Sequence, residues 1–155
     1  MGVGPSTKET SLHHFRDPLL DLFQNDEDID FVGFIVSGTP QSNDEKDYVA
    51  ARTGAWLEAM RVDGVLVSID GWGNSHVDFA QTFEEIGRRG IPSVGLSFIG
   101  TQAKFVFENE YMQTIVDFNK SKAGIETTVV GENTVDSLDA RKALALLKLK
   151  MRGKK

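Results

Sequence analysis

The side chains best suited to chemistry lie close together at residues 70–78, where the chain reads Asp-Gly-Trp-Gly-Asn-Ser-His-Val-Asp. Asp70 and His76 are the candidate catalytic residues, because a carboxylate near an imidazole can orient the ring, raise its pKa and support general acid–base catalysis. A structural role is the alternative, in which Asp70 bonds the amides of its own loop and His76 lies on the first exposed turn of a helix. Trp72, between two glycines, is placed to cover a ligand or a partner surface.

Polar loops follow two further apolar segments of the chain, at residues 37–42 and 100–104. If these segments are parallel strands, their carboxyl ends lie at one edge of a sheet, where ligands bind in folds of this kind. The three loops then form one surface that faces a substrate or a partner. Its expected residues are Thr39, Gln41, Trp72, Asn74, Thr101, Gln102 and Lys104.

The same loops give little support for a bound metal or nucleotide. A metal held by Asp70 and His76 lacks a clear fourth ligand, because Asp78 is accounted for as a helix-capping residue. Neither a Gly-x-Gly-x-x-Gly nor a Walker sequence is present. Asp44 and Glu45 follow the loop at 37–42, where they complement the helix dipole and repel phosphate. We therefore expect neither a metal site nor a nucleotide cofactor.

Apolar segments of strand-like composition alternate with amphipathic segments of helical period. The predicted strands are residues 29–36, 65–69, 91–98 and 125–130, with a short additional strand at 104–107. The predicted helices begin at Asp17-Pro18, at Ser42 with Glu45 as a capping box, at Ser75 with Asp78 as a second one, at Tyr111 (to 122), and at Asn133 or Thr134. This alternation predicts an α/β fold: a three-layer sandwich with a mostly parallel sheet of about four strands and helices on both faces.

Helical spacing also predicts which side chains point into the core. In the helix after Ser42 they are Tyr48, Ala51, Ala55 and Ala59 in one row and Val49, Trp56 and Met60 in the next. In the helix after Ser75 they are Val77, Ala80, Phe83 and Ile86, and in the last helix they include Leu138, Ala145 and Leu149.

Length and composition limit the classes of protein to be considered. The 155 residues suffice for one domain at 1–155, with a flexible arm at 1–16 and a flexible tail at 152–155. The net charge is −6 and basic residues gather only near the C-terminus, so we expect no nucleic-acid partner. No apolar run reaches the roughly 20 residues that cross a bilayer. Because the N-terminus is no secretory signal and cysteine is absent, we expect a cytoplasmic protein without disulfides.

Several blocks of the chain resemble those of a known family. The blocks are residues 4–15, 36–41, 70–79, 100–105 and 131–134, and Asp-Gly-Trp-Gly-Asn-Ser-His at 70–76 is the most specific of them. Together they extend over nearly the whole chain. In these blocks the chain resembles the D-proline reductase proprotein family, in its carboxyl-terminal part, and the related component B subunits of glycine, sarcosine and betaine reductases.

The resemblance implies a role in anaerobic amino-acid reduction. In this family a proprotein is cleaved at a cysteine to form a pyruvoyl group that captures the amine substrate, and a selenocysteine on another subunit attacks carbon. Because this chain contains no cysteine, we expect no pyruvoyl cofactor in it and no full activity of the chain alone. The implied function is that of an accessory or structural paralogue. Its partners would be other subunits of an oligomeric reductase complex that opens the ring of D-proline.

Two alternatives remain open from the residues themselves. The chain could be a non-catalytic module that binds a small amino acid or carboxylate, with Lys104 and loop amides as anion contacts. It could also be an acid–base enzyme, which requires the side chains of Asp70 and His76 within about 2.6–3.2 Å of each other, directly or through one water.

Overall fold

A computed structural model describes residues 18–69, 73–97, 105–119 and 135–153 of the chain. In chain order the elements are α2 (Pro18–Asn25), α3 (Asn43–Ala59), β1 (Val65–Ser68), α4 (Asn74–Arg88), β2 (Ser93–Ser97), β3 (Ile115–Asp117) and α5 (Ser137–Gly153). The α/β class predicted from the sequence is confirmed. Among the described helices, none is both long and apolar enough to cross a membrane.

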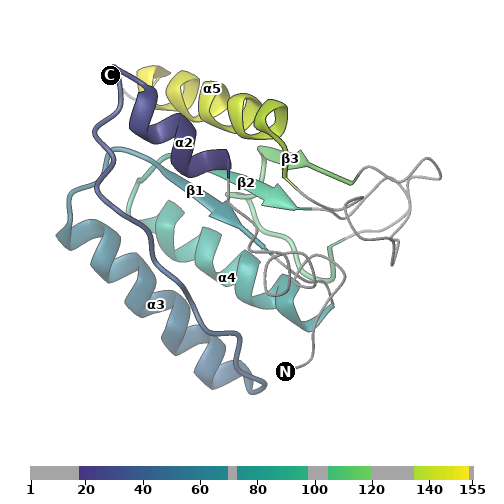
Figure 1. Ribbon diagram of the computed structural model, residues 1–155. Helices are drawn as coiled ribbons and strands as arrows, with labels where there is room; N and C mark the ends of the chain where they lie inside the picture. The colour runs from purple at the N-terminus through teal and green to yellow at the C-terminus, as the bar shows by residue number, and fades with distance from the viewer. Residues whose placement is uncertain (1–17, 70–72, 98–104, 120–134, 154–155) are drawn as a thin grey trace.

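The described strands form a three-stranded parallel sheet in the order β1-β2-β3. Val65 of β1 is aligned with Ser93 of β2, and Gly95 of β2 is aligned with Ile115 of β3. Parallel pairing needs a crossover connection, and α4 supplies it between β1 and β2 (Figure 1). The predicted parallel pairing is confirmed, whereas the predicted strand at 125–130 lies outside the described residues.

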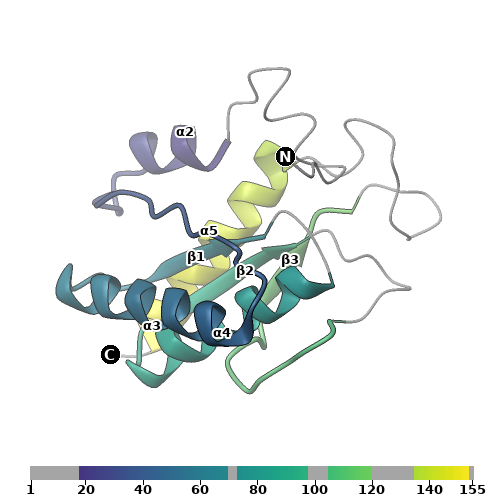
Figure 2. The same cartoon turned by 90° about the horizontal axis from the view of Figure 1, so that it is seen from below.

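Helices cover both faces of this sheet. On one face, Val94 and Leu96 of β2 pack against α5 and α2, which lie together above the sheet in Figure 1. On the other face, Gly95 lies so close to Phe79 and Phe83 of α4 that an added Cβ would be 2.9 Å from the first ring and 3.1 Å from the second. The second helix on that side is α3, which packs along α4 (Figure 2).

Residues 29–36, predicted as a buried strand, belong to no strand, so this prediction is wrong. Ile35 packs against the cluster around Leu57 and Ile86. The alternate side chains are exposed, with 58% of Val32, 74% of Phe34 and 85% of Val36 accessible. The physical reason is that, within the described residues, no backbone hydrogen bond joins 30–36 to a neighbouring strand. An apolar composition indicates a strand, but a strand forms only where the backbone hydrogen-bonds to an adjacent strand.

The helix predicted for 111–122 is also wrong in its described part, because β3 occupies Ile115–Asp117. The Asn109 side chain accepts a hydrogen bond from the Tyr111 amide at 3.0 Å and so forms a turn there. The β-branched residues that follow then pair with β2. The short strand predicted at 104–107 is absent from its described residues, 105–107.

The predicted start of the last helix is also wrong. We predicted Asn133 or Thr134 as its cap, but α5 begins at Ser137. The Asp136 carboxylate instead accepts hydrogen bonds from the amides of Leu138 (2.8 Å) and Asp139 (2.9 Å). The predicted cap was therefore two to three residues early, and a carboxylate does the capping.

The predicted inward faces of two helices are wrong. In α3 the buried residues are Lys46, Ala50, Thr53, Gly54 and Leu57, and Tyr48, Trp56 and Met60 are exposed. In α5 the predicted Leu138, Ala145 and Leu149 are exposed, and the buried residues include Ala140, Ala143, Leu144 and Leu147. In both helices much of the buried face is made of small side chains, which allow close approach to a neighbouring element. In α4 the prediction is confirmed for Ala80, Phe83 and Ile86, whereas Val77 is half-buried.

Candidate functional site

The candidate site surrounds the N-terminus of α4, which begins at the carboxyl end of the sheet. Gly73 precedes the helix with φ +63°, a left-handed conformation that favours glycine. No side chain caps the helix, and its first turn contains no acidic residue. The predicted capping box of Ser75 and Asp78 is therefore wrong, because the helix already begins at Asn74.

Two of the predicted surface residues meet at this point. Asn74 Nδ2 donates to Gln41 Oε1 at 3.5 Å, which brings the loop at 37–42 against the first turn of α4. Thr39, in the same loop, is exposed. The remaining predicted positions Asp70, Trp72, Thr101, Gln102 and Lys104 lie outside the described residues.

His76 lies in the first turn of α4 and is buried, with only 2% of its surface accessible. Its Nδ1 accepts a hydrogen bond from the Val106 amide at 3.4 Å, and its ring centroid is 4.8 Å from that of Phe105. Burial lowers the pKa of His76 below its usual value of 6.5. The imidazole is thus neutral at pH 7, with its proton on Nε2 because Nδ1 is the acceptor. The exposed position considered for His76 in its structural role is wrong.

The loop at 100–104 was predicted to reach the same edge, and the residues just after it do so. Phe105 and Val106 are the residues that contact His76. Since the loop at 37–42 also contacts this turn, through Asn74, segments on both sides of α4 converge at its N-terminus. Gln41, Asn74 and the residues after 104 therefore lie around the same helix N-terminus. The loop at 100–104 and Asp70 lie outside the described residues, so the meeting of all three loops and the distance between Asp70 and His76 stay predictions.

Ser97 is a second buried polar residue at this end of the sheet, and the sequence analysis missed it. Its side chain is 0% exposed and stands on the same face of β2 as Gly95, because alternate residues of a strand share a face. That is the face covered by α4. Neither Ser97 Oγ nor His76 Nε2 has a hydrogen-bond partner among the described residues. Buried polar atoms are almost always paired, so each of these two atoms is free to bond a further polar group.

Lys46 is the other residue that the sequence analysis missed. Its side chain is 1% exposed, and its Nζ donates to Asp78 Oδ2 at 2.5 Å and to the carbonyl oxygen of Pro40. The pair joins the first turn of α3 to the second turn of α4, and Lys46 also contacts the loop at 37–42 through Pro40. The row of small residues Ala50 and Gly54 signals close helix packing, but no local pattern links a lysine to a carboxylate 32 positions away.

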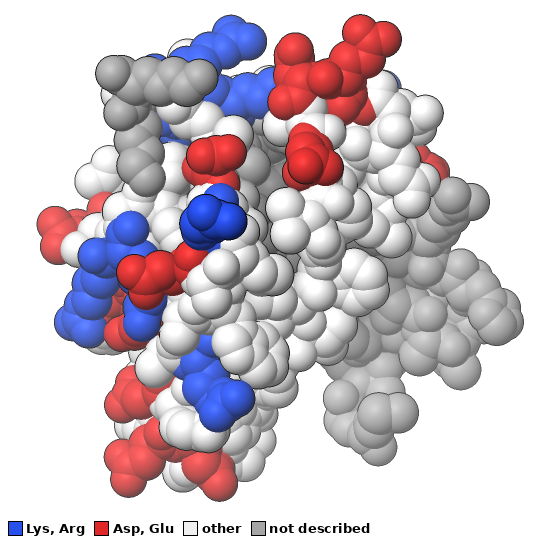
Figure 3. Space-filling model, turned by 90° about the vertical axis from the view of Figure 1, so that its left-hand side faces the viewer, with Lys and Arg blue, Asp and Glu red and all other residues white. Residues whose placement is uncertain are grey.

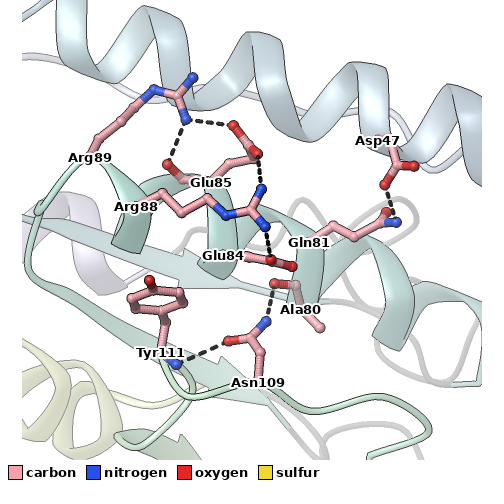
Figure 4. Close-up of polar contacts among 9 residues, drawn as sticks. All are labelled: Asp47, Ala80, Gln81, Glu84, Glu85, Arg88, Arg89, Asn109 and Tyr111. Atoms are coloured by element: carbon pink, nitrogen blue, oxygen red, sulfur yellow. Dashed lines mark hydrogen bonds and ion pairs between the residues drawn. The ribbon is translucent and has the colours of Figure 1, made fainter.

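Further polar contacts hold α4 in position beneath this site (Figure 4). Asp47 of α3 accepts a hydrogen bond from Gln81, and Glu58 of α3 pairs with Arg89 at the end of α4 at 3.3 Å. Asn109 Nδ2 donates to the carbonyl oxygen of Ala80 at 2.7 Å. These contacts fix the helix from two sides. The described residues contain no group of His, Asp and Glu side chains that could hold a metal ion.

A parallel sheet with polar side chains gathered at its carboxyl edge defines a domain of the open α/β class. The chain belongs to the family of glycine/sarcosine/betaine reductase component B subunits, whose family model matches residues 2–140. This finding confirms the family resemblance read from the sequence blocks.

Two curated relatives show how far the similarity extends. The chain is 45% identical over 146 residues to the D-proline reductase proprotein PrdA of Acetoanaerobium sticklandii, across 94% of this chain and 23% of that protein. It is 28% identical over 94 residues to the sarcosine reductase complex component B subunit alpha of Peptoclostridium acidaminophilum, across 59% of this chain and 22% of that protein. The chain thus spans about a quarter of the length of these relatives. No solved structure matches it.

Proposed function

We propose that the chain acts as a subunit or accessory paralogue of component B in a reductase complex for D-proline or a related amino acid. The observation that carries the proposal is the 45% identity to the D-proline reductase proprotein over 94% of the chain. Because the chain corresponds to about a quarter of that protein, its contribution is that of one domain within a larger assembly. The partners are then other subunits of the complex.

Association with the complex is the property to test. An affinity-tagged form of the chain would be expressed in a proline-fermenting cell and purified with its bound proteins. We expect subunits of D-proline reductase among them, identified by mass spectrometry. If these subunits are recovered only at the level of an untagged control, the chain is not a component of the complex.

We also propose that the chain carries no pyruvoyl group, because the family forms that group at a cysteine and this chain has none. The intact mass of the purified chain should then equal that of one uncleaved polypeptide. A product with a pyruvoyl terminus would contradict this proposal while leaving membership of the complex in place.

A second candidate function is the binding of a small carboxylate at the N-terminus of α4. It is supported by the uncapped, acid-free first turn of α4 and by the buried, unpaired His76 Nε2 and Ser97 Oγ among the described residues. A carboxylate there would accept hydrogen bonds from donors that otherwise lose their hydration without replacement.

Thermal unfolding with and without ligand tests the second candidate. A ligand that binds only the folded chain must raise the unfolding temperature. We expect D-proline, glycine, sarcosine or betaine to raise it in the wild type and to have a smaller effect in His76→Phe, which keeps an aromatic ring but no donor. Unchanged unfolding temperatures at saturating concentrations of all four would remove this candidate.

A further inference from the structure

The outer face of α3 carries a ladder of three long side chains, one helical turn apart. Arg52 Cζ lies 5.5 Å from the ring centroid of Tyr48 and 5.3 Å from that of Trp56. Arg52 Nη1 also donates to the Tyr48 hydroxyl at 3.0 Å. Although these contacts fix the side chains, 60% of Tyr48 and 51% of Trp56 remain exposed. Because the ladder is already ordered, a partner that binds it immobilises fewer free rotamers.

An apolar groove runs beside this ladder. It has a volume of about 410 Å³ and lies between Phe34 and Val36 on one side and Trp56 and Met60 of α3 on the other. Trp56 belongs to both features, so the ladder and the groove form one continuous surface, which we call the α3 surface. Figure 3 shows the side of the molecule on the left of Figure 1, where a broad uncharged area lies between groups of charged side chains.

The composition of the α3 surface is that of a protein interface. Tyr, Trp, Phe, Met and Arg are the residue types enriched in interfaces, and Trp, Tyr and Arg contribute most of the binding hot spots. A contiguous exposed apolar area of this kind marks a site of interaction on a folded protein. No described element of the chain covers it.

Arg52 indicates the charge of the partner. Arg88 and Arg89 are paired with glutamates, whereas no acidic side chain of the described residues pairs with Arg52. Its only described hydrogen bond goes to Tyr48, which leaves most of its five donors available. A carboxylate on the partner would accept a charge-assisted hydrogen bond from the Arg52 guanidinium.

We propose that the α3 surface binds a protein face with apolar side chains around a carboxylate, supplied by the portion of a component B reductase subunit that this chain does not match. The inference rests on the proposed function. The relatives contain about three quarters of their length beyond the matched region, so a domain of this kind has a large protein surface against which to pack. The groove receives the apolar side chains and Arg52 receives the carboxylate.

The test measures the affinity of the full chain for purified D-proline reductase complex by biolayer interferometry. Arg52→Glu places like charge against the partner's carboxylate, and Phe34→Ser removes an apolar wall of the groove. The matched controls, Arg141→Glu and Leu149→Ser, make the same kinds of change on the exposed face of α5. Thermal unfolding of every variant confirms that it is folded.

We expect each α3 variant to raise the Kd at least about tenfold, as loss of a hot-spot residue does. The two α5 controls should remain within about twofold of the wild type. Arg52→Lys, which keeps the charge but loses the fork of donors, should fall between wild type and Arg52→Glu.

Three results would overturn the inference, and each has a different meaning. If the wild type binds the complex and the α3 variants bind equally well, the proposed function stands and another surface makes the contact. If the wild type does not bind, both proposals fail. If light scattering shows a dimer of the chain alone that Phe34→Ser dissociates, the α3 surface is occupied by a second copy instead.

Discussion

Buried polar side chains decide the geometry of the candidate site at the scale of single residues. Lys46 and Asp78 join α3 to α4. His76 joins α4 to the segment after residue 104 through the Val106 amide. Each of these residues buries a polar group away from water. The cost of that burial is offset only where a hydrogen-bond or charge partner replaces the water.

Replacement of Lys46 by methionine should lower the free energy of unfolding by about 3 kcal/mol, because it leaves a buried carboxylate without its cation. Asp78 is only 13% exposed, and the Pro40 carbonyl also loses its donor. Urea denaturation measures the change, and Lys142→Met, at an exposed position of α5, is the matched control. The double variant Lys46→Met/Asp78→Leu should recover part of the loss. If the separate effects of Lys46→Met and Asp78→Leu add up to the effect of the double variant, the two residues are not coupled.

The buried His76 should make stability depend on pH in a defined direction. Its pKa is lowered in the folded state from the usual 6.5, so below about pH 6.5 the unfolded chain binds the proton first. The free energy of unfolding should therefore fall as the pH is lowered from 6.5, and this contribution should be constant above that value. Urea denaturation between pH 5.5 and 7.5 measures the slope, which His76→Gln should reduce.

Nuclear magnetic resonance gives an independent check on His76. The structure requires the neutral tautomer with its proton on Nε2, because Nδ1 accepts from Val106. An Nδ1-protonated ring, or a pKa at or above 6.5, would contradict the buried environment described for this residue.

At the scale of elements, the start of α5 shows how two aspartates position a helix. Asp136 Oδ1 accepts from the amides of Leu138 and Asp139, and Asp139 Oδ2 accepts from the Asp136 amide at 3.2 Å. This reciprocal arrangement is a capping box with aspartate in both positions. It fixes the end of α5 that lies beside the carboxyl edge of the sheet (Figure 1).

Asp136→Ala should lower the free energy of unfolding by about 1 kcal/mol, because two amides of the first turn lose their acceptor. Ser137→Ala changes the next residue, which is exposed and makes no capping bond to the backbone among the described residues. That control should stay within about 0.5 kcal/mol of the wild type. Equal effects of the two changes in urea denaturation would show that Asp136 is not the cap.

At the scale of the whole molecule, the segment at 29–36 distinguishes the described fold from the one predicted from sequence. It runs beside α3 on the β1 side of the sheet (Figure 1). Ile35 anchors it in the cluster that contains Val65 and Val67 of β1. Because the amides of residues 30–36 make no described backbone hydrogen bond, packing of side chains such as Ile35 holds this part of the segment among the described residues.

Hydrogen–deuterium exchange should distinguish these two arrangements. We expect the amides of 30–36 to exchange much faster than those of β2, which is buried and paired on both sides. Mass spectrometry of peptic peptides gives both rates in one experiment. Protection of 30–36 equal to that of β2 would show that this segment is a fourth strand of the sheet, as its composition indicates.

Local patterns were enough to predict the α/β class and the positions of α3, α4, β1 and β2. Strand composition and helical period are properties of neighbouring residues, so they are present in the chain before it folds. The family, too, could be read from the sequence blocks, of which the one at residues 70–76 is the most specific, and the matched family model confirms it.

Tertiary structure decided the features that depend on distant partners. Whether Trp56 points in or out depends on what α3 packs against, and the Gly54 side of the helix fits closer to α4. The pairing of Lys46 with Asp78 and of His76 with Val106 joins residues 32 and 30 positions apart. Periodicity can locate an apolar stripe on a helix, but which face of the helix is buried depends also on the surface of the element that packs against it. His76 could be singled out from the sequence, but its burial, and the roles of Lys46 and Ser97, could be identified only after the helices had been packed on the sheet.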